Sequence, residues 1–277
     1  VVNLITFYAQ EVREILAQIG ARSIDEIIGR ADLLTQVSRG AANLDDIDLN
    51  PMLISVDGAR SITYDRTKPR NAVPDTLDAE IIKDGHRFFE DGEKMQLSYA
   101  VRNTLRTIGT RASSHIVKKF GMRNALQPDH LTVKLTGSCG QSLGAFSVRG
   151  LKLEVQGDAN DYVGKGLSGG TITVRPLMSS PLKAEENTII GNTVLYGATD
   201  GFLFASGRAG ERFAVRNSGA SVVVEGCGSN GCEYMTGGVA VILGRIGANF
   251  GAGMTGGMAY VYDPEGVAED FINIESI

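Results

Sequence analysis

The stretch from Gly219 to Asp263 repeats a short unit, and this repeat limits the possible folds more than any other feature of the chain. In each unit a β-branched or aliphatic run follows glycine or another small residue. The runs SVVVEG, VAVILG and MAYVYD end at Gly226, Gly244 and Asp263. Their near-constant spacing of about 19 residues is close to that of the shortest solenoid repeats, and a fixed period of one strand and one glycine-rich turn predicts a stack of similar coils.

The same period extends upstream to about residue 131. LTVKLTG ends at Gly137, LKLEVQG at Gly157 and TITVRP at Pro176, at nearly the same interval. The segment LMSSPLKAEENTI then interrupts the count. FLFASG resumes it and ends at Gly207, one such interval before Gly226. We interpret the terminal glycines as corners, because glycine accepts positive φ without a steric penalty.

A second series of apolar runs lies out of phase with the first. TVLY starts at Thr193 and FAVR at Phe213, which predicts at least two short strands in each coil. Coils of equal length pair each strand in parallel with its equivalent one coil away. Seven coils over 131–263 would form a rod of about 35 Å. The predicted fold class is all-β dominated, a right-handed parallel β-helix (solenoid) with a helical N-terminal extension.

The distribution of glycine divides the chain near residue 130. The segment 1–130 holds 8 of the 35 glycines, and 131–277 holds 27. The ends of a solenoid must be covered to prevent aggregation, and the final segment 267–277 is a candidate cover. The predicted divisions are a helical tail at 1–36, a linker at 37–75, a mixed α/β cap at 76–130 and the β-helix with its C-terminal tail at 131–277.

Local patterns upstream of the repeats predict several helices and one strand. Apolar residues at helical spacing, glycine stops and alternation support these predictions. The expected elements are a helix over 1–20, a helix from Thr76 to Asp84 ended by Gly85, a strand from Met95 to Val101, and a helix that starts at Ser113 or Ser114 and ends at Gly121.

Composition excludes several classes of protein. The net charge of −5 argues against nucleic acid and anionic membranes as partners. No apolar run approaches the roughly 20 residues that cross a bilayer. Three cysteines do not suit a secreted disulfide framework, so we expect a cytoplasmic protein. The chain begins Val-Val-Asn, and we expect a piece excised from a longer polypeptide, with a processed terminus as the alternative.

The pattern GxGxxG occurs three times, at 164–169, 226–231 and 251–256. A dinucleotide-binding loop requires the last glycine to open a helix. The first and third copies instead run into the predicted strands TITVR and MAYVY. We therefore interpret all three as corners of the repeat.

The cysteines do not form a recognisable site. Cys227 and Cys232 form a CxxxxC pattern and Cys139 is distant, whereas zinc and iron–sulfur sites usually need four ligands. The segment GSCGQS around Cys139 resembles a nucleophile site, but a thiol nucleophile needs a base. The three histidines, all outside the repeats, are His86, His115 and His130.

An acidic cluster at Asp45, Asp46 and Asp48 lacks the glycine and distal glutamate of an EF-hand, and we interpret it as solvated linker. We therefore predict no catalytic, cofactor-binding or metal-binding residue in this chain. The alternative hypothesis is a stand-alone ligand-binding or catalytic β-helix centred on Cys139 or on this cluster.

Several motifs carry a family resemblance. The segments NTLRTIGTRASSHIVKKFG, GSCGQSLGAF, DANDYVGKGLSGGTITV, MTGGVAVILG and GAGMTGGMAYVYD closely resemble the C-terminal glycine-repeat (GXGXG) domain of the glutamate synthase large subunit. This resemblance is strong over 100–263. The opening segment 1–34 resembles the helical exit from the flavin-binding synthase domain of that family. A weaker resemblance exists to a subunit of formylmethanofuran dehydrogenase.

The resemblance implies a right-handed parallel β-helix that holds the amidotransferase and FMN-binding synthase domains in relation to each other. The parent enzyme would hydrolyse glutamine, pass ammonia to 2-oxoglutarate and reduce the imine to glutamate through FMN and a 3Fe–4S cluster. The catalytic N-terminal cysteine of the family has no counterpart, since residue 1 is valine. The flavin barrel and the cluster cysteines would lie upstream.

The resemblance also implies partners and a location. The partners would be the upstream domains of the same polypeptide, a reductase small subunit or ferredoxin as electron donor, and further copies in a homo-oligomer. The location would be the cytoplasm, or the plastid for a plant-type protein.

Overall fold

The computed structural model describes residues 1–55, 72, 74–122 and 126–275. The chain forms two compact units, Val1–Val73 and Pro74–Ile277. Much of the predicted linker, 56–71 and residue 73, lies outside the described residues. No helix in the described ranges combines the length and apolar character needed to cross a bilayer.

The first unit is helical and leaves most of its apolar side chains exposed. Helix α1 (Val2–Gln18) ends just before Gly20, close to the predicted stop, and Leu16 is its one buried residue. After α1, the predicted helical tail contains the short 3-10 turns η1 (Ile24–Glu26) and η2 (Ala31–Leu33). Two further short elements, α2 (Ala42–Asp45) and η3 (Asn50–Met52), lie in the segment predicted as a linker.

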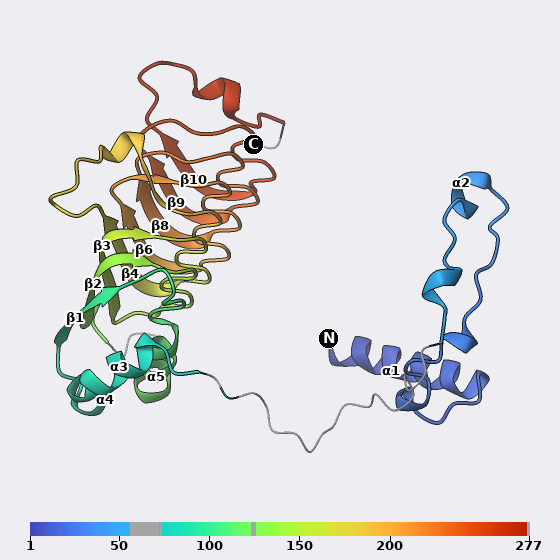
Figure 1. Ribbon diagram of the computed structural model, residues 1–277. Helices are drawn as coiled ribbons and strands as arrows, with labels where there is room; N and C mark the ends of the chain where they lie inside the picture. The colour runs from blue at the N-terminus through green and yellow to red at the C-terminus, as the bar shows by residue number, and fades with distance from the viewer. Residues whose placement is uncertain (56–71, 73, 123–125, 276–277) are drawn as a thin grey trace. The chain divides into compact units, whose positions relative to one another are not determined.

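The second unit is dominated by one parallel sheet of ten strands within the described residues, and the sheet is not closed. Eight strands follow one path in the order β1-β2-β3-β4-β6-β8-β9-β10, while β5 pairs with β3 and β7 (Figure 1). The strands are β1 (Met95–Val101), β2 (Leu131–Cys139), β3 (Leu151–Ala159), β4 (Ser168–Arg175), β5 (Thr188–Ile190), β6 (Asp200–Ala205), β7 (Arg208–Ala209), β8 (Ser218–Val224), β9 (Thr236–Ile242) and β10 (Gly256–Val261).

Alternation along the strands builds the core. In β2, β3 and β6, side chains on one face are buried and most of those on the other are at least partly exposed, whereas β10 at the end of the sheet is only partly buried. Parallel register stacks the buried residues into columns, as expected for coils of equal length. One column contains Val133, Leu153, Ile172, Leu203, Val222, Ala240 and Ala259.

Two predictions about the coils were wrong. Gly137 and Gly157 are not corners: they lie inside β2 and β3 and face each other in register. The out-of-phase runs from Thr193 and Phe213 are not strands but turns. In these turns Thr193 and Leu195 have φ of 59° and 58°, so the backbone alternates into the left-handed region. A pattern in which every second side chain is apolar fits this conformation as well as it fits a strand, so the pattern does not distinguish the two.

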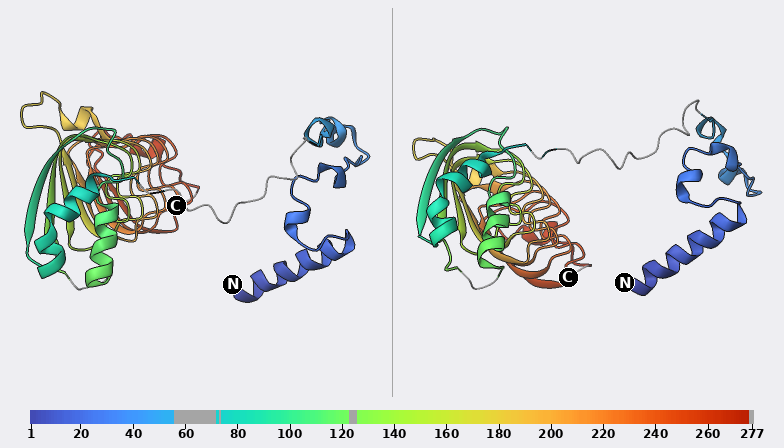
Figure 2. Two further views of the ribbon diagram at one scale, coloured as in Figure 1. Left: turned by 60° about the horizontal axis from the view of Figure 1, so that its bottom comes forward. Right: turned by 90° about the horizontal axis from the view of Figure 1, so that it is seen from below.

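Both ends of the sheet are covered. Helices α3 (Leu77–Asp84), α4 (His86–Asp91) and α5 (Thr110–Phe120) gather at the β1 end, as Figures 1 and 2 show from different sides. At the other end lie η6 (Ala268–Phe271) and Ile272, which forms a bridge with Phe250. The described residues of the segment 267–277 thus lie at this end of the sheet, and 276–277 lie outside the described residues. A short turn, η5 (Ala184–Glu186), occupies the insertion after β4.

Helix α5 begins at Thr110, earlier than the predicted start at Ser113 or Ser114. Ser113 is buried within the helix. The carboxylate of Asp78, from α3, accepts the backbone N–H groups of Gly109, Arg111 and Ala112 at 2.7, 2.6 and 3.0 Å. A capping group from another helix therefore takes the place of the local serine cap that the sequence suggested.

Candidate functional site

The turns opposite the main sheet repeat an unusual backbone pattern. In six successive turns, residues at three alternate positions have φ between 53° and 76°. Most residues in these columns are not glycine, although the left-handed region costs an L-residue roughly 1–2 kcal/mol. The first column is Ser142, Tyr162, Thr193, Arg212, Asn230 and Asn249; the second Gly144, Gly164, Leu195, Ala214, Cys232 and Gly251; the third Phe146, Gly166, Gly197, Arg216, Tyr234 and Gly253.

Hydrogen bonds between successive turns hold this pattern. In the coil at 162–166, the N–H groups of Tyr162 and Gly166 donate to the carbonyls of Asn192 and Tyr196, both at 2.8 Å. The N–H of Gly164, between them, donates in the other direction, to the carbonyl of Leu143 at 2.8 Å. These are the N–H groups that a phosphate-binding loop would keep free for its ligand. Here carbonyl groups of the neighbouring coils already engage them.

Aromatic rings explain two of the three glycines in the third column, Gly166 and Gly253, whereas Gly197 has open space beside it. A Cβ on Gly166 would lie 2.5 Å from ring atoms of Phe146, and one on Gly253 would lie 2.4 Å from the ring of Tyr234. Each ring therefore lies against the glycine of the following coil. The first and third GxGxxG copies run into β4 and β10, as predicted, and their glycines serve contacts between coils.

The three cysteines are buried as free thiols. Burial, reinforced by the charge of Asp158, raises the pKa of Cys139 to about 12. Burial raises the pKa of Cys227 to about 12 and also raises that of Cys232. A thiol acts as a nucleophile or metal ligand only after it loses its proton, so these environments suppress that chemistry.

The histidines make contacts outside the repeats, away from GSCGQS in the sequence. Nε2–H of His130 donates to the carbonyl of Gly92 at 2.7 Å, and the ring of His115 lies edge-on to Phe89. His86 begins α4. The structure thus gives His115 and His130 packing or hydrogen-bonding partners in the α-helical cap.

The acidic cluster of the first unit makes local hydrogen bonds. Asp45 accepts the hydroxyl of Ser38 and the N–H of Arg39, and these bonds lower its pKa. Asp48 accepts the N–H of Asn50 at 3.0 Å. Among the described residues, no three His, Cys, Asp or Glu side chains are grouped so that they could hold a metal ion.

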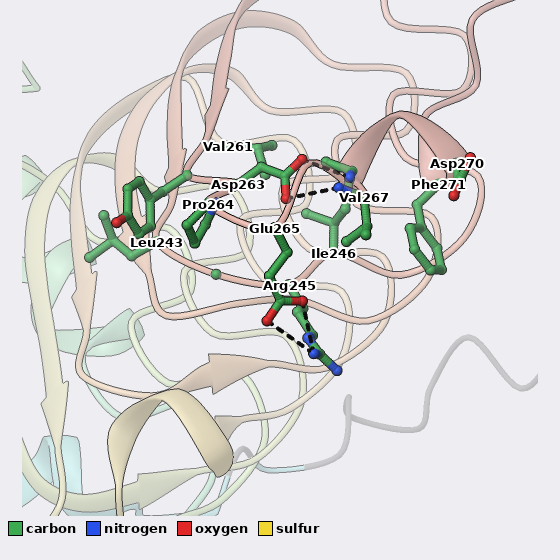
Figure 3. Close-up of a pocket in the computed structure, with 13 residues that line it drawn as sticks. Leu243, Arg245, Ile246, Val261, Asp263, Pro264, Glu265, Val267, Asp270 and Phe271 are labelled. Atoms are coloured by element: carbon green, nitrogen blue, oxygen red, sulfur yellow. Dashed lines mark hydrogen bonds and ion pairs between the residues drawn. The ribbon is translucent and has the colours of Figure 1, made fainter.

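A cavity of about 480 Å³ lies at the C-terminal end of the second unit, and no sequence pattern predicted it. Its walls come from the end of β9, the end of β10 and the segment around η6 (Figure 3). Leu243, Val261 and Phe271 supply apolar surface, and Arg245 pairs with Glu265 at 3.0 Å. The sequence signal closest to it is the turn Asp-Pro-Glu-Gly after the last repeat.

Asp263 fixes one wall of this cavity. Its carboxylate accepts the N–H groups of Ala268 and Val267 at 2.8 and 3.2 Å. The bond from Ala268 is the main cause of a lowered pKa at Asp263.

This carboxylate predicts a pH dependence. A carboxyl group whose pKa is lower in the folded state than in the unfolded state stabilises the fold. This stabilisation is fully present above the unfolded-state pKa and is lost as the pH falls through the folded-state pKa. We therefore expect amide hydrogen exchange at Ala268 to accelerate as pH is lowered below about 4, after correction for the intrinsic rate. Asp263→Ala should exchange fast at every pH. A corrected rate that is independent of pH in the wild type would contradict this role.

The parallel sheet, the stacked left-handed turns and the recurring glycines define a glycine-repeat β protein. The family model described as "GXGXG motif" matches residues 78–277, and the chain belongs to this family.

Curated relatives extend the match to the first unit. The chain is 69% identical over its whole length to the glutamate synthase [NADPH] large chain of Azospirillum brasilense, and covers 18% of that protein. It is 46% identical to the glutamate synthase [NADH] of Schizosaccharomyces pombe and 45% identical to ferredoxin-dependent glutamate synthase 2 of Synechocystis sp., over the whole chain in both cases. It spans 13% and 18% of those proteins.

Proposed function

We propose that this chain is the C-terminal structural domain of a glutamate synthase large chain, and that it holds the amidotransferase and FMN-binding synthase domains in relation to each other. The observation that carries the proposal is the 69% identity to a glutamate synthase large chain over all 277 residues. The parent reaction would convert glutamine, 2-oxoglutarate and reducing equivalents into two glutamates. The relatives' names include NADPH, NADH and ferredoxin, so the donor is left open.

We further infer that the second unit is a right-handed parallel β-helix. Hydrogen bonds between successive turns run along the stack opposite the main sheet, which supports a coiled path. The short strands β5 and β7 pair with each other, and β5 also pairs with β3. This ladder lies off the main path and supports a further side of the proposed β-helix. Right-handed crossovers between parallel strands are strongly favoured, which supports the handedness.

The proposed divisions remain 1–36, 37–75, 76–130 and 131–277. In the proposed cap at 76–130, strand β1 pairs with β2 of the main sheet, so the cap would be continuous with the solenoid. We propose that this chain binds neither FMN nor the 3Fe–4S cluster of the parent, and that it contributes no catalytic residue. The raised pKa values of its thiols support this division of roles.

The test compares this chain alone with the complete gene product that contains it. The complete product should show flavin absorbance and glutamine-dependent glutamate formation, and this chain alone should show neither. Cys139→Ser in the complete product should retain turnover within about twofold, because a buried, protonated thiol takes no part in the chemistry. Flavin binding by the chain alone, or loss of turnover in a folded Cys139→Ser variant, would contradict the proposal.

A further inference from the structure

The outer face of the main sheet changes character along the stack. Two columns of outward-facing residues cross eight strands in register. The first column is Gln96, Thr132, Lys152, Thr171, Phe202, Ser221, Val239 and Met258; the second is Ser98, Lys134, Glu154, Thr173, Phe204, Val223, Val241 and Tyr260. On β1 to β4 every member is polar or charged, whereas on β6 to β10 seven of the eight are apolar or aromatic.

The apolar half is exposed. Phe202 and Phe204 are 49% and 43% exposed, and their rings stack at 6.3 Å between centroids. Met258 and Tyr260, at the other end of the same columns, are 59% and 54% exposed. Core packing does not explain these side chains, because the inward face of each strand already supplies the core.

The apolar face continues into the terminal cavity. Leu243 follows β9 and Tyr262 follows β10 on the same outward side, and they are 44% and 63% exposed. Both also line the cavity of about 480 Å³. A flat aromatic surface that ends in an apolar pocket is the arrangement in which protein interfaces concentrate their binding energy.

We propose that this apolar outer face, formed by Phe202, Phe204, Val223, Val239, Val241, Leu243, Met258, Tyr260 and Tyr262, is where another domain of the same polypeptide docks. The proposal rests on the proposed function, which places further domains on the chain. The two columns carry no charged side chain in this half, and Glu225, which follows β8 beside Leu243, borders the face. The docked surface is therefore mainly apolar.

The size of the face favours a tethered domain over a second copy. Six large side chains, each about half exposed, present on the order of 500 Å². Contacts between domains of one chain start near about 600 Å² in total, whereas stable separate partners bury about 800 Å² on each side. Covalent linkage supplies the effective concentration that makes a contact of this size sufficient.

The test measures cysteine accessibility in the complete gene product. Phe204→Cys and Tyr260→Cys probe the apolar half, and Ser98→Cys is the matched control in the same column on the polar half. Each variant is treated with a maleimide, and the modified site is identified by peptide mass. The three buried thiols of this chain, with raised pKa values, should react slowly, and peptide mass separates cysteines elsewhere in the product from the introduced ones. Rates in guanidinium correct for intrinsic reactivity.

Docking predicts that the two apolar-half variants react at least about tenfold more slowly than Ser98→Cys in the native protein, and equally in guanidinium. Equal native rates in a product that still forms glutamate from glutamine would overturn the docking face and leave the proposed function standing. A complete gene product that does not form glutamate from glutamine, or that is no longer than this chain, would overturn both the docking face and the proposed function. Protection that disappears on hundredfold dilution would identify a second copy as the occupant and overturn the tethered domain.

Discussion

Replacing Gly157 with alanine is expected to destabilise the second unit by more than about 4 kcal/mol, the range reached only by severe steric or burial defects. Gly157 lies in β3 directly opposite Gly137 of β2, with φ of 148°. A Cβ at this position would lie 2.0 Å from the carbonyl oxygen of Gly137 and 2.7 Å from its carbonyl carbon. Because Cβ has no rotamer, the overlap can be relieved only if the two strands separate or the backbone at residue 157 changes conformation.

Gly197→Ala is the matched control. Gly197 lies in the same stack with φ of 65°, but a Cβ there would meet no atom within 4 Å. Its replacement should cost only the left-handed backbone strain, about 1–2 kcal/mol. Guanidinium unfolding followed by circular dichroism compares the two, with soluble yield recorded for Gly157→Ala. Equal midpoints for the two variants would show that the close approach of β2 and β3 is not limiting.

The repeating part of the fold could be predicted well from the sequence. The regular period implied seven coils from residue 131 onward, and seven strands of the main path begin there or later in the described chain. The strand Met95–Val101 and the helix ended by Gly85 are confirmed. These features depend on alternation and glycine stops, which local sequence records directly.

The wrong predictions share a cause. Leu195 and Ala214 adopt the left-handed conformation because the preceding turns provide acceptors for their N–H groups. Leu195 donates to the carbonyl of Val163, and Ala214 donates to the carbonyl of Val194. No local propensity predicts that conformation for leucine. Gly137 and Gly157 look like corners in sequence, but they are required by the close approach of two strands. The cavity beside Asp263 was also missed, since its walls come from two stretches, 243–246 and 261–271, that only the fold brings together.

The stacked turns give the glycine motif a physical meaning. In the pair Gly164 and Gly166, the first glycine faces the core, where a Cβ would lie 2.8 Å from Leu195. The second lies beneath the ring of Phe146. The spacing of two residues between these glycines therefore follows from two columns of residues with left-handed backbone. One column faces the core, and the other faces an aromatic ring. Contacts between successive turns thus account for both glycines of this pair.

Asp78→Ala is expected to destabilise the second unit by about 3–5 kcal/mol, because it leaves buried donors without an acceptor. Asp78 is 1% exposed, and its carboxylate accepts three N–H groups at the start of α5. Burial raises its pKa, against the pull of those three donors. Alanine would remove the carboxylate that ties α3 to the N-terminus of α5 through these hydrogen bonds, and the helix pair covers the β1 end of the sheet.

Asp75→Ala separates this capping role from a general loss of charge. Asp75 lies shortly before α3, is 89% exposed at its side chain and approaches Arg111 at 3.5 Å. An exposed ion pair of this kind contributes little, so its removal should change the free energy of unfolding by less than about 1 kcal/mol. Both variants are compared by guanidinium unfolding, and Asp78→Asn should fall between them because its amide keeps one acceptor oxygen. If Asp78→Ala and Asp75→Ala unfolded at the same midpoint, the buried carboxylate would not be what anchors α5, and the packing of α3 against α5 would have to hold that end of the stack alone.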